Sequence, residues 1–293
     1  MDERDQLAER FEAQRGRLRA VAYRMLGSPD EADDAVQETW LRLSRVDAGE
    51  VDNLAGWLRT VVTRICLDML RSRRSRREDL TEQEVLDQFS KPGPGSPPED
   101  EAVLTDSVSR ALLVVLDTLD PVERVAFVLH DMFAVPFNRI APLVERTPVA
   151  TKKLASRARH KVQGTPVVPA AEIARHRQVV SAFLAAARAG DLAAILAVLA
   201  PDVVRRADAV ALPPGVAAEV RGAQAVAKGT AALARRSQFA ELALVNGTVG
   251  VVVAPRGRLL LALTFTIDDD RITAYDVIAD PARLRELDLA VLD

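Results

Sequence analysis

The first 75 residues carry apolar positions at the spacing of α-helices. Leu18, Val21 and Met25 recur three or four apart, and Gly27-Ser28-Pro29-Asp30 then breaks the run. A second helix is predicted through residues 35–43 and a third from 54 to 73. The inner stripe of the third helix is expected to comprise Leu58, Val61, Val62, Ile65 and Met69. The pattern predicts an all-α module over residues 1–75.

A second helical module is predicted over residues 104–163. Asp120-Pro121-Val122-Glu123 combines an N-cap aspartate, a proline at the first helical position and a glutamate at the third, so a helix is expected to begin there. A short second helix carries Ile140, Leu143 and Val144, and Thr147 is expected to cap a third helix. Pro142 fits only if the second helix begins late or kinks, because proline inside a helix costs about 3 kcal/mol.

The third helix of this module has one apolar and one basic face. Ala150, Leu154 and Ala158 lie four apart and are expected to pack inward, opposite a polar face. Such a helix is typical of a helix-turn-helix that enters the major groove, because Lys and Arg pair with guanine edges or phosphates and hydroxyls serve either. A solvated basic face on an ordinary bundle is the alternative. The candidate DNA-binding residues here are Thr151, Lys152, Lys153, Ser156 and Arg157.

Residues 172–293 have a mixed rather than a purely helical pattern. Helices are predicted at 172–189, 191–200 and 223–235. Three stretches rich in Val, Leu, Ile and Thr follow at 241–253, 258–267 and 271–278, and Asn246-Gly247 is a strong turn signal within the first. Helices followed by antiparallel strands predict an α+β domain.

Two segments without apolar periodicity separate these modules. Residues 76–103 include Pro92-Gly93-Pro94-Gly95-Ser96-Pro97-Pro98, a composition that predicts a flexible linker. Residues 164–171 begin with Gly164-Thr165-Pro166 and predict a shorter hinge. The predicted fold class is therefore multidomain, with two all-α modules followed by an α+β domain.

Composition narrows the chemistry that is possible. The net charge of −3 means that a nucleic-acid interface must be a local basic face. The single cysteine, Cys66, excludes an intramolecular disulfide and a multi-cysteine zinc site, and its apolar helical surroundings predict burial. Residues 71–77 contain five arginines, which suit either a phosphate backbone or a solvated linker start. No signal-peptide core or long apolar stretch is present, so we expect a cytoplasmic protein without membrane contact, metal or cofactor.

Residues 22–40 read Ala-Tyr-Arg-Met-Leu-Gly-Ser-Pro-Asp-Glu-Ala-Asp-Asp-Ala-Val-Gln-Glu-Thr-Trp. This segment resembles the region-two helix pair of the extracytoplasmic-function (ECF) sigma factors, which grips the clamp helices of the polymerase β′ subunit. The resemblance implies core RNA polymerase, through its β′ and β subunits, as a partner. The positions that match core-binding residues of the family are Asp34, Gln37, Glu38 and Trp40.

Two further segments resemble the promoter-binding parts of the same family. Residues 57–64 are similar to the helix that helps to melt and read the minus-ten element, and the loop 46–53 before it is where the family captures a flipped-out base. The candidates there are Asn53, Trp57 and Arg64. Residues 119–163 resemble region four, which recognises the minus-thirty-five element. Lys152, Lys153 and Ser156 fall where the family places its base contacts.

The C-terminal module has its own resemblance. Leu199-Ala-Pro-Asp-Val-Val204 and the helix-then-sheet order resemble a SnoaL-like domain of the ketosteroid-isomerase-like superfamily. Sigma factors with this fused domain form a SigJ-like group, in which the extension restrains and supports activity through intramolecular contacts. Residues 280–284 match the position of a C-terminal motif of that group, which makes Asp280, Pro281 and Leu284 candidate regulatory residues.

These observations predict an alternative sigma factor that binds core RNA polymerase, recognises promoter DNA and initiates transcription. Its C-terminal domain is expected to modulate this activity, with no catalytic residues of its own. One alternative is a SnoaL-like enzyme acting on a small hydrophobic molecule, with Asp202, Asp208, Tyr275 and Asp276 as conceivable acid–base groups. Another is a helix-turn-helix repressor with a ligand-sensing domain, which co-purification with core polymerase would distinguish.

Overall fold

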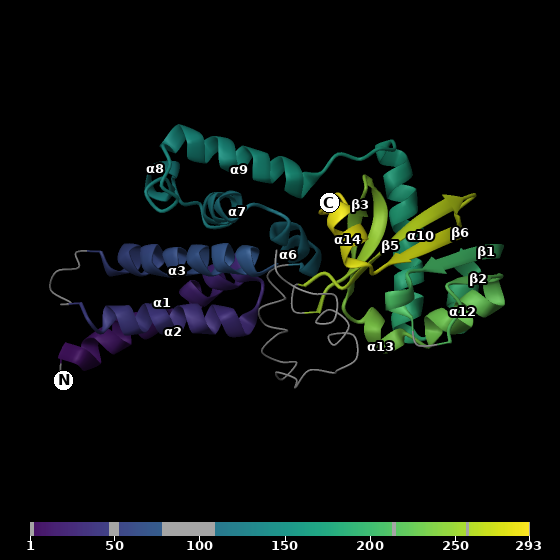
Figure 1. Cartoon of the computed structure of the whole chain (residues 1–293), viewed down its shortest axis with the longest axis horizontal. Coiled ribbons are helices and arrows are strands. Elements are labelled where there is room, and N and C mark those ends of the chain that lie inside the picture. Colours follow the sequence, from purple (N-terminus) through teal and green to yellow (C-terminus); the bar gives the residue numbers. More distant parts are fainter. Residues whose placement is uncertain (1–2, 47–52, 78–108, 213–214, 256–257, 293) are drawn as a thin grey trace. The chain divides into compact units, whose positions relative to one another are not determined.

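Figure 1 shows a computed structural model of the chain, which describes residues 3–46, 53–77, 109–212, 215–255 and 258–292. These residues form two compact units. The first comprises the described residues up to 77 together with 116–160, and the second comprises 109–115 and 161–292. The unit boundaries therefore fall inside the second predicted helical module. Most of the predicted linker, 78–103, lies outside the described residues.

Three long helices open the first unit and pack against one another (Figure 1): α1 (Glu3–Leu26), α2 (Pro29–Leu43) and α3 (Leu54–Arg77). The break between α1 and α2 lies where the sequence predicts it. Gly27 has a φ of +77°, which favours glycine. The Ser28 hydroxyl caps α2 by accepting the Glu31 N–H at 3.4 Å. This turn fixes the entry of the chain into α2.

The buried face of α3 is close to the predicted one. Leu58, Val62 and Ile65 are buried as predicted, whereas Val61 and Met69 are only half-buried. Cys66 occupies an inner position, and burial raises the pKa of its thiol to about 12. The predicted burial of this cysteine is confirmed.

Shorter elements form the helix-turn-helix segment: α6 (Arg110–Asp117), α7 (Pro121–Phe127), the π-helical turn η2 (Val128–Met132), α8 (Phe137–Ile140) and α9 (Pro148–Gln163). Asp120 caps α7 as predicted, because its side chain accepts the Val122 N–H at 3.0 Å. The prediction that Leu143 and Val144 belong to the second helix is wrong. The helix ends at Ile140, so Pro142 lies in the turn that follows and interrupts no helix.

The inward face of α9 also differs from the predicted one. Ala150 and Leu154 are half-buried, and the buried positions are Thr151, Ala155, Ala158 and Val162. Steps of four residues overshoot the helical repeat of 3.6, so a stripe made only of such steps turns away from the core. The observed steps of four, three and four follow the repeat.

The second unit combines helices with one sheet. Its helices are α10 (Ala170–Ala189), α11 (Leu192–Val198), the 3-10 turn η3 (Ala209–Ala211), α12 (Ala223–Ala231), α13 (Ala234–Ser237) and α14 (Pro281–Glu286). Its strands are β1 (Leu199–Ala207), β2 (Glu219–Arg221), β3 (Ala240–Val245), β4 (Thr248–Val253), β5 (Leu261–Asp268), β6 (Arg271–Ile278) and β7 (Leu289–Ala290). The strand order is β2-β1-β6-β5-β4-β3-β7, and α10 contacts β3 and β4.

The sheet confirms the α+β prediction with one topological difference. Strands β3 to β6 form the expected antiparallel meander, and Asn246-Gly247 joins β3 to β4. The predicted helix 191–200 ends at Val198, however, and the chain continues as β1, which pairs parallel with β6. The predicted hinge is held on the sheet, because the Val167 N–H donates to the Gly247 carbonyl at 3.0 Å.

One carboxylate ties the end of the sheet to α14. The Asp208 Oδ2 accepts the N–H groups of Ala279 and Asp280, both at 2.9 Å, and its Oδ1 pairs with Arg283. Burial by itself raises the pKa of the Asp208 carboxyl group. The two N–H groups and the Arg283 guanidinium outweigh this effect, so the pKa of Asp208 is lowered. Asp280 then caps α14 by accepting the Ala282 N–H at 2.9 Å. Asp208 thus stabilises the start of the C-terminal tail.

Replacing Asp208 by Asn should lower the free energy of unfolding by about 1–3 kcal/mol at pH 7, because charge-assisted hydrogen bonds are lost. A lowered pKa means that this contribution is present above the unfolded-state value of about 3.9 and is lost as pH falls through the lower folded value. Urea denaturation should therefore show a constant difference down to about pH 5 and a shrinking one below about pH 4. The control is Asp202→Asn, at an exposed position. An Asp208→Asn variant that is as stable as the parent at pH 7 would contradict this role of Asp208.

Candidate nucleic-acid and partner interfaces

The polar face of α9 is exposed where the sequence predicts DNA contacts. Thr147 caps the helix, since its hydroxyl accepts the Ala150 N–H at 3.2 Å. Lys152, Lys153 and Ser156 are exposed and lie within three turns of that cap. Their ammonium and hydroxyl groups are therefore available to a nucleic-acid backbone or to base edges.

The other two candidates on α9 contact the protein itself. Thr151 is buried, and its hydroxyl donates to the Thr147 carbonyl at 2.9 Å. The Arg157 Nε lies 3.4 Å from a carboxylate oxygen of the buried Glu123, although the Arg157 side chain is 64% exposed. Thr151 and Arg157 therefore both contact the protein itself, whereas Lys152, Lys153 and Ser156 are exposed.

The turns around α8 are fixed by side chains. The His130 ring stacks on Phe137 with centroids 3.8 Å apart, and its Nδ1 lies 3.0 Å from the Val135 carbonyl. Arg159 of α9 donates to Asp131 at 2.8 Å. Glu145 adopts a φ of +54° in the turn before α9. Together these contacts orient the exposed face of α9 relative to α7 and α8.

The candidate residues on α3 lie at its outer side. Trp57 is half-buried and Arg64 is exposed, and a separation of seven residues places them on one helical face. Asn53 caps α3, because its side chain accepts the Gly56 N–H at 2.9 Å. Residues 47–52 of the predicted base-capture loop lie outside the described residues.

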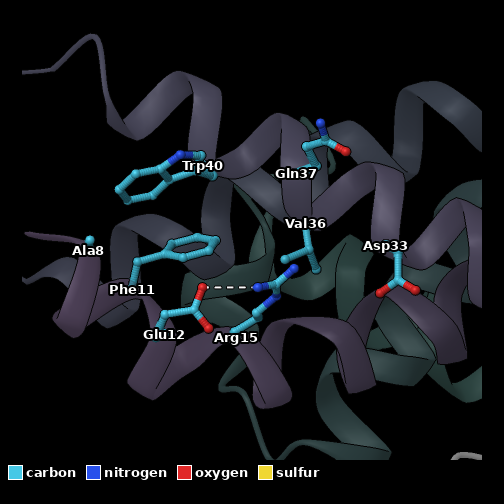
Figure 2. Close-up of a pocket in the computed structure, with 8 residues that line it drawn as sticks. All are labelled: Ala8, Phe11, Glu12, Arg15, Asp33, Val36, Gln37 and Trp40. Carbon is cyan, nitrogen blue, oxygen red and sulfur yellow. Dashed lines mark hydrogen bonds and ion pairs between the residues drawn. The ribbon is translucent and has the colours of Figure 1, made fainter. Parts of the chain in front are cut away.

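The candidate residues on α2 border a groove between α1 and α2 (Figure 2). Gln37 and Trp40 line this groove, and the Trp40 ring packs against Phe11 with centroids 5.0 Å apart. Asp34 and Glu38 lie on the neighbouring outer side, where Glu38 pairs with Arg42 at 3.0 Å. The cavity holds about 260 Å³ and is lined by Ala8, Phe11, Glu12, Arg15, Asp33, Val36, Gln37 and Trp40. The outer surface of α2 thus combines acidic side chains with a partly apolar hollow.

An ion network in the first unit joins the α1–α3 bundle to Asp117 and α7. Arg124 is 2% exposed and its Nη1 donates to Asp117 at 3.2 Å. Arg73 lies 3.8 Å from the same carboxylate, pairs with Glu31 and donates to the Leu26 carbonyl at 3.0 Å. This network was not predicted from the sequence, in which its one signal is an arginine in the middle of the buried run of α7.

The predicted regulatory residues make local contacts. Asp280 caps α14, while Pro281 and Leu284 are half-buried. The contacts between the sheet domain and the ends of the helix-turn-helix segment, all inside the second unit, come from other residues. Glu241 of β3 accepts the Ser109 hydroxyl at 2.8 Å and the Ala111 N–H at 2.9 Å.

The end of α9 is held in a similar way. The Val291 N–H, just after β7, donates to the Val162 carbonyl at 2.8 Å. Gly164, with a φ of +63°, packs so closely on Ala290 that a Cβ there would collide with it. The start of α6 and the end of α9 therefore both contact the C-terminal domain.

The interior of the C-terminal domain is packed with aromatic side chains. The ring centroid of Phe183 lies 5.5 Å from the ring centroids of both Phe265 and Tyr275. The Tyr275 hydroxyl is 2.9 Å from that of Thr230, and burial raises its pKa. Of the other conceivable acid–base groups, Asp276 lies 3.9 Å from Arg206, and Asp208 is engaged with the tail.

The described residues contain no group of three or more His, Cys, Asp or Glu side chains placed to hold a metal ion. None of the described helices is both long enough and apolar enough to cross a lipid bilayer.

Comparison with known proteins identifies the family. Residues 10–76 match the Sigma-70 region 2 family. The chain is 37% identical over 284 residues to the ECF RNA polymerase sigma factor SigJ of Mycobacterium tuberculosis (strain ATCC 25618 / H37Rv), covering 92% of this chain and 91% of that protein. It is 34% identical over 290 residues to the probable ECF RNA polymerase sigma factor SigI of Mycobacterium tuberculosis (strain CDC 1551 / Oshkosh), covering 98% of each.

A solved structure is similar over the same length. The crystal structure of the Mycobacterium tuberculosis extracytoplasmic function sigma factor SigJ is 32% identical, covers 94% of this chain and 98% of its own, and has a TM-score of 0.46. The predicted order of helical sigma modules and a C-terminal α+β domain is confirmed. With relatives of this identity spanning almost all of its length, the chain belongs to the ECF family of RNA polymerase sigma factors.

Proposed function

We propose that this alternative sigma factor recognises the minus-thirty-five element with α9, helps to open the minus-ten element with α3, and binds the β′ and β subunits of core polymerase through a surface that includes α2. Its family binds core polymerase and promoter DNA. The observation that carries the proposal is the exposed polar face of α9, with Lys152, Lys153 and Ser156 held outward by an anchored helix.

The recognition of the minus-thirty-five element is supported by the division of roles on α9. Arg157 and Arg159 pair with Glu123 and Asp131, so they anchor the helix against its own domain. The side chains of Lys152 and Lys153 lie on the exposed face of the helix. Lysines can pair with guanine edges or phosphates, which suits a helix that enters the major groove.

The minus-ten assignment is supported by the outer face of α3. Trp57 presents an aromatic ring and Arg64 a guanidinium on one side of the helix. An aromatic ring stacks on an unpaired base and a cation tracks the backbone, which is the chemistry of single-strand binding. Asn53 holds the start of α3 next to these groups.

Core binding is supported by the surface of α2. Asp34 and Gln37 are exposed, and Glu38 and Trp40 are half-buried beside the groove of Figure 2. An acidic surface beside a partly apolar hollow is complementary to a basic helical partner with apolar side chains.

The C-terminal domain is proposed to restrain the helix-turn-helix segment and to have no catalytic role. Glu241 and Val291 contact the start of α6 and the end of α9, and a tethered domain has a high effective concentration, on the order of millimolar for a short flexible linker. Weak contacts therefore suffice for restraint.

Replacing Lys152 or Lys153 by Ala should weaken promoter binding by the holoenzyme. At a base-contacting position the variant should also lose about 1–3 kcal/mol of discrimination between matched and mismatched promoters, whereas loss of a phosphate contact weakens all sequences alike. Fluorescence anisotropy on both duplexes measures this difference. Lys228→Ala, at an exposed lysine of α12, is the control. Parental binding by both variants on both duplexes would refute the assignment of α9.

Reversing two charges, Asp34→Lys with Glu38→Lys, should weaken association with core polymerase at least tenfold, since opposite charges at an interface become like charges. Circular dichroism should show unchanged helix content, because neither side chain is buried. Asp202→Lys with Asp268→Lys, at exposed positions of β1 and β5, matches the charge change elsewhere. If the folded α2 variant is retained by core polymerase as well as this control, α2 is not the contact surface.

A further inference from the structure

An exposed apolar side chain stands at the start of α9. Val149 is 68% exposed, and it is the one exposed large apolar side chain of this helix, which is described throughout. Single exposed valines are ordinary on protein surfaces. The role of Val149 follows from its position rather than from its exposure alone.

Val149 belongs to the same stripe as the candidate base contacts. Lys152, Lys153 and Ser156 follow it at three, four and seven residues, the spacing of one helical face. The residue lies in the first helical turn, directly after Thr147 and Pro148. In helix-turn-helix proteins the N-terminal residues of the recognition helix are the ones that contact base edges. Val149 is thus placed at the part of α9 that would lie deepest in the major groove.

The chemistry of valine selects one feature of that groove. Its two methyl groups neither donate nor accept hydrogen bonds, so they cannot recognise the N7, O6 or amino groups of the bases. The C5-methyl group of thymine is the apolar feature that the major groove presents, and apolar side chains contact it. Burying methyl against methyl removes apolar surface from water, whereas placing valine against a polar base edge leaves that edge without its hydrogen bonds.

We propose that Val149 is a specificity-determining residue that contacts the C5-methyl group of a thymine in the minus-thirty-five element. The inference rests on the proposed recognition of that element by α9 and adds to it an apolar contact that the basic residues do not supply. Val149 then favours thymine at one position, while Lys152 and Lys153 supply attraction to phosphates or guanines.

The test removes the methyl group of thymine and the methyl groups of Val149 in separate experiments. The probe is a promoter duplex selected by the holoenzyme from a library randomised across the minus-thirty-five element, with each thymine replaced in turn by deoxyuridine. Deoxyuridine keeps every hydrogen-bonding group of thymine and lacks only the methyl group. For the parent holoenzyme, one such replacement should weaken binding about three- to fivefold, the loss expected for one buried methyl group. For Val149→Ala, that replacement should have no effect, and its binding to the thymine duplex should already be weaker by a similar factor.

The control is Val167→Ala, because Val167 is 69% exposed and lies outside α9. It should keep the parental sensitivity to deoxyuridine. The inference is overturned if Val149→Ala keeps the parental penalty at every thymine, if the selected element contains no thymine, or if Val149→Ala weakens core binding instead of DNA binding. If one of these results is obtained while Lys152→Ala and Lys153→Ala weaken promoter binding in the same assay, only the inference about Val149 fails and the proposed function stands. When none of the three variants changes binding, the proposed function itself fails.

Discussion

The carboxylate of Asp117, shared by Arg124 and Arg73, is the interaction on which the first unit depends most. Arg124 is almost completely buried, and a guanidinium removed from water is tolerated only when it is paired and hydrogen-bonded. Asp117 provides that partner, and Arg73 extends the network to Glu31 and to the Leu26 carbonyl at the end of α1. Removing one partner from such a buried pair typically costs about 3–5 kcal/mol. The network therefore fixes α3 relative to α7.

The charges of this network are separate from those proposed to bind partners. The buried Arg124 pairs with Asp117, whereas the charged side chains proposed to contact DNA lie on the surface of α9. On α9, Arg157 and Arg159 pair with acidic residues of α7 and η2, whereas Lys152 and Lys153 are exposed. On α2, Asp34 is exposed. A family of transcription factors that binds both DNA and a large enzyme needs this separation of structural from functional charge.

Sequence signals that act within one helix or one turn predicted the fold well. Asp120 and Thr147 are the predicted caps, and each helix start they mark is confirmed because a cap satisfies backbone N–H groups of its own helix. Asn246-Gly247 likewise closes the predicted hairpin. The first two residues of β1, Leu199 and Ala200, were predicted as the end of a helix, because the strand character of β1 comes from parallel pairing with β6, about 70 residues away in sequence.

The candidate sites show the same limit. Helical periodicity predicted the exposure of Lys152, Lys153 and Ser156. It missed the burial of Thr151, because the inner face of the helix was predicted with steps of four residues only. The ion network of Arg124 and the contacts of Glu241 join residues far apart in sequence, for which no short motif exists. Where two segments meet only in the folded chain, pattern analysis of one segment carries no signal.

Run-off transcription by purified core RNA polymerase, on a promoter selected from a random library, tests the central claim most directly. With the intact chain we predict a transcript that starts at one position and requires both the chain and the promoter. Glu241→Ala removes the contact with the start of α6 and should increase this transcript, whereas Glu219→Ala, at an exposed edge-strand carboxylate, should leave it unchanged. Absence of a promoter-specific transcript with all three proteins would contradict the assignment of this chain as a sigma factor that acts with core polymerase.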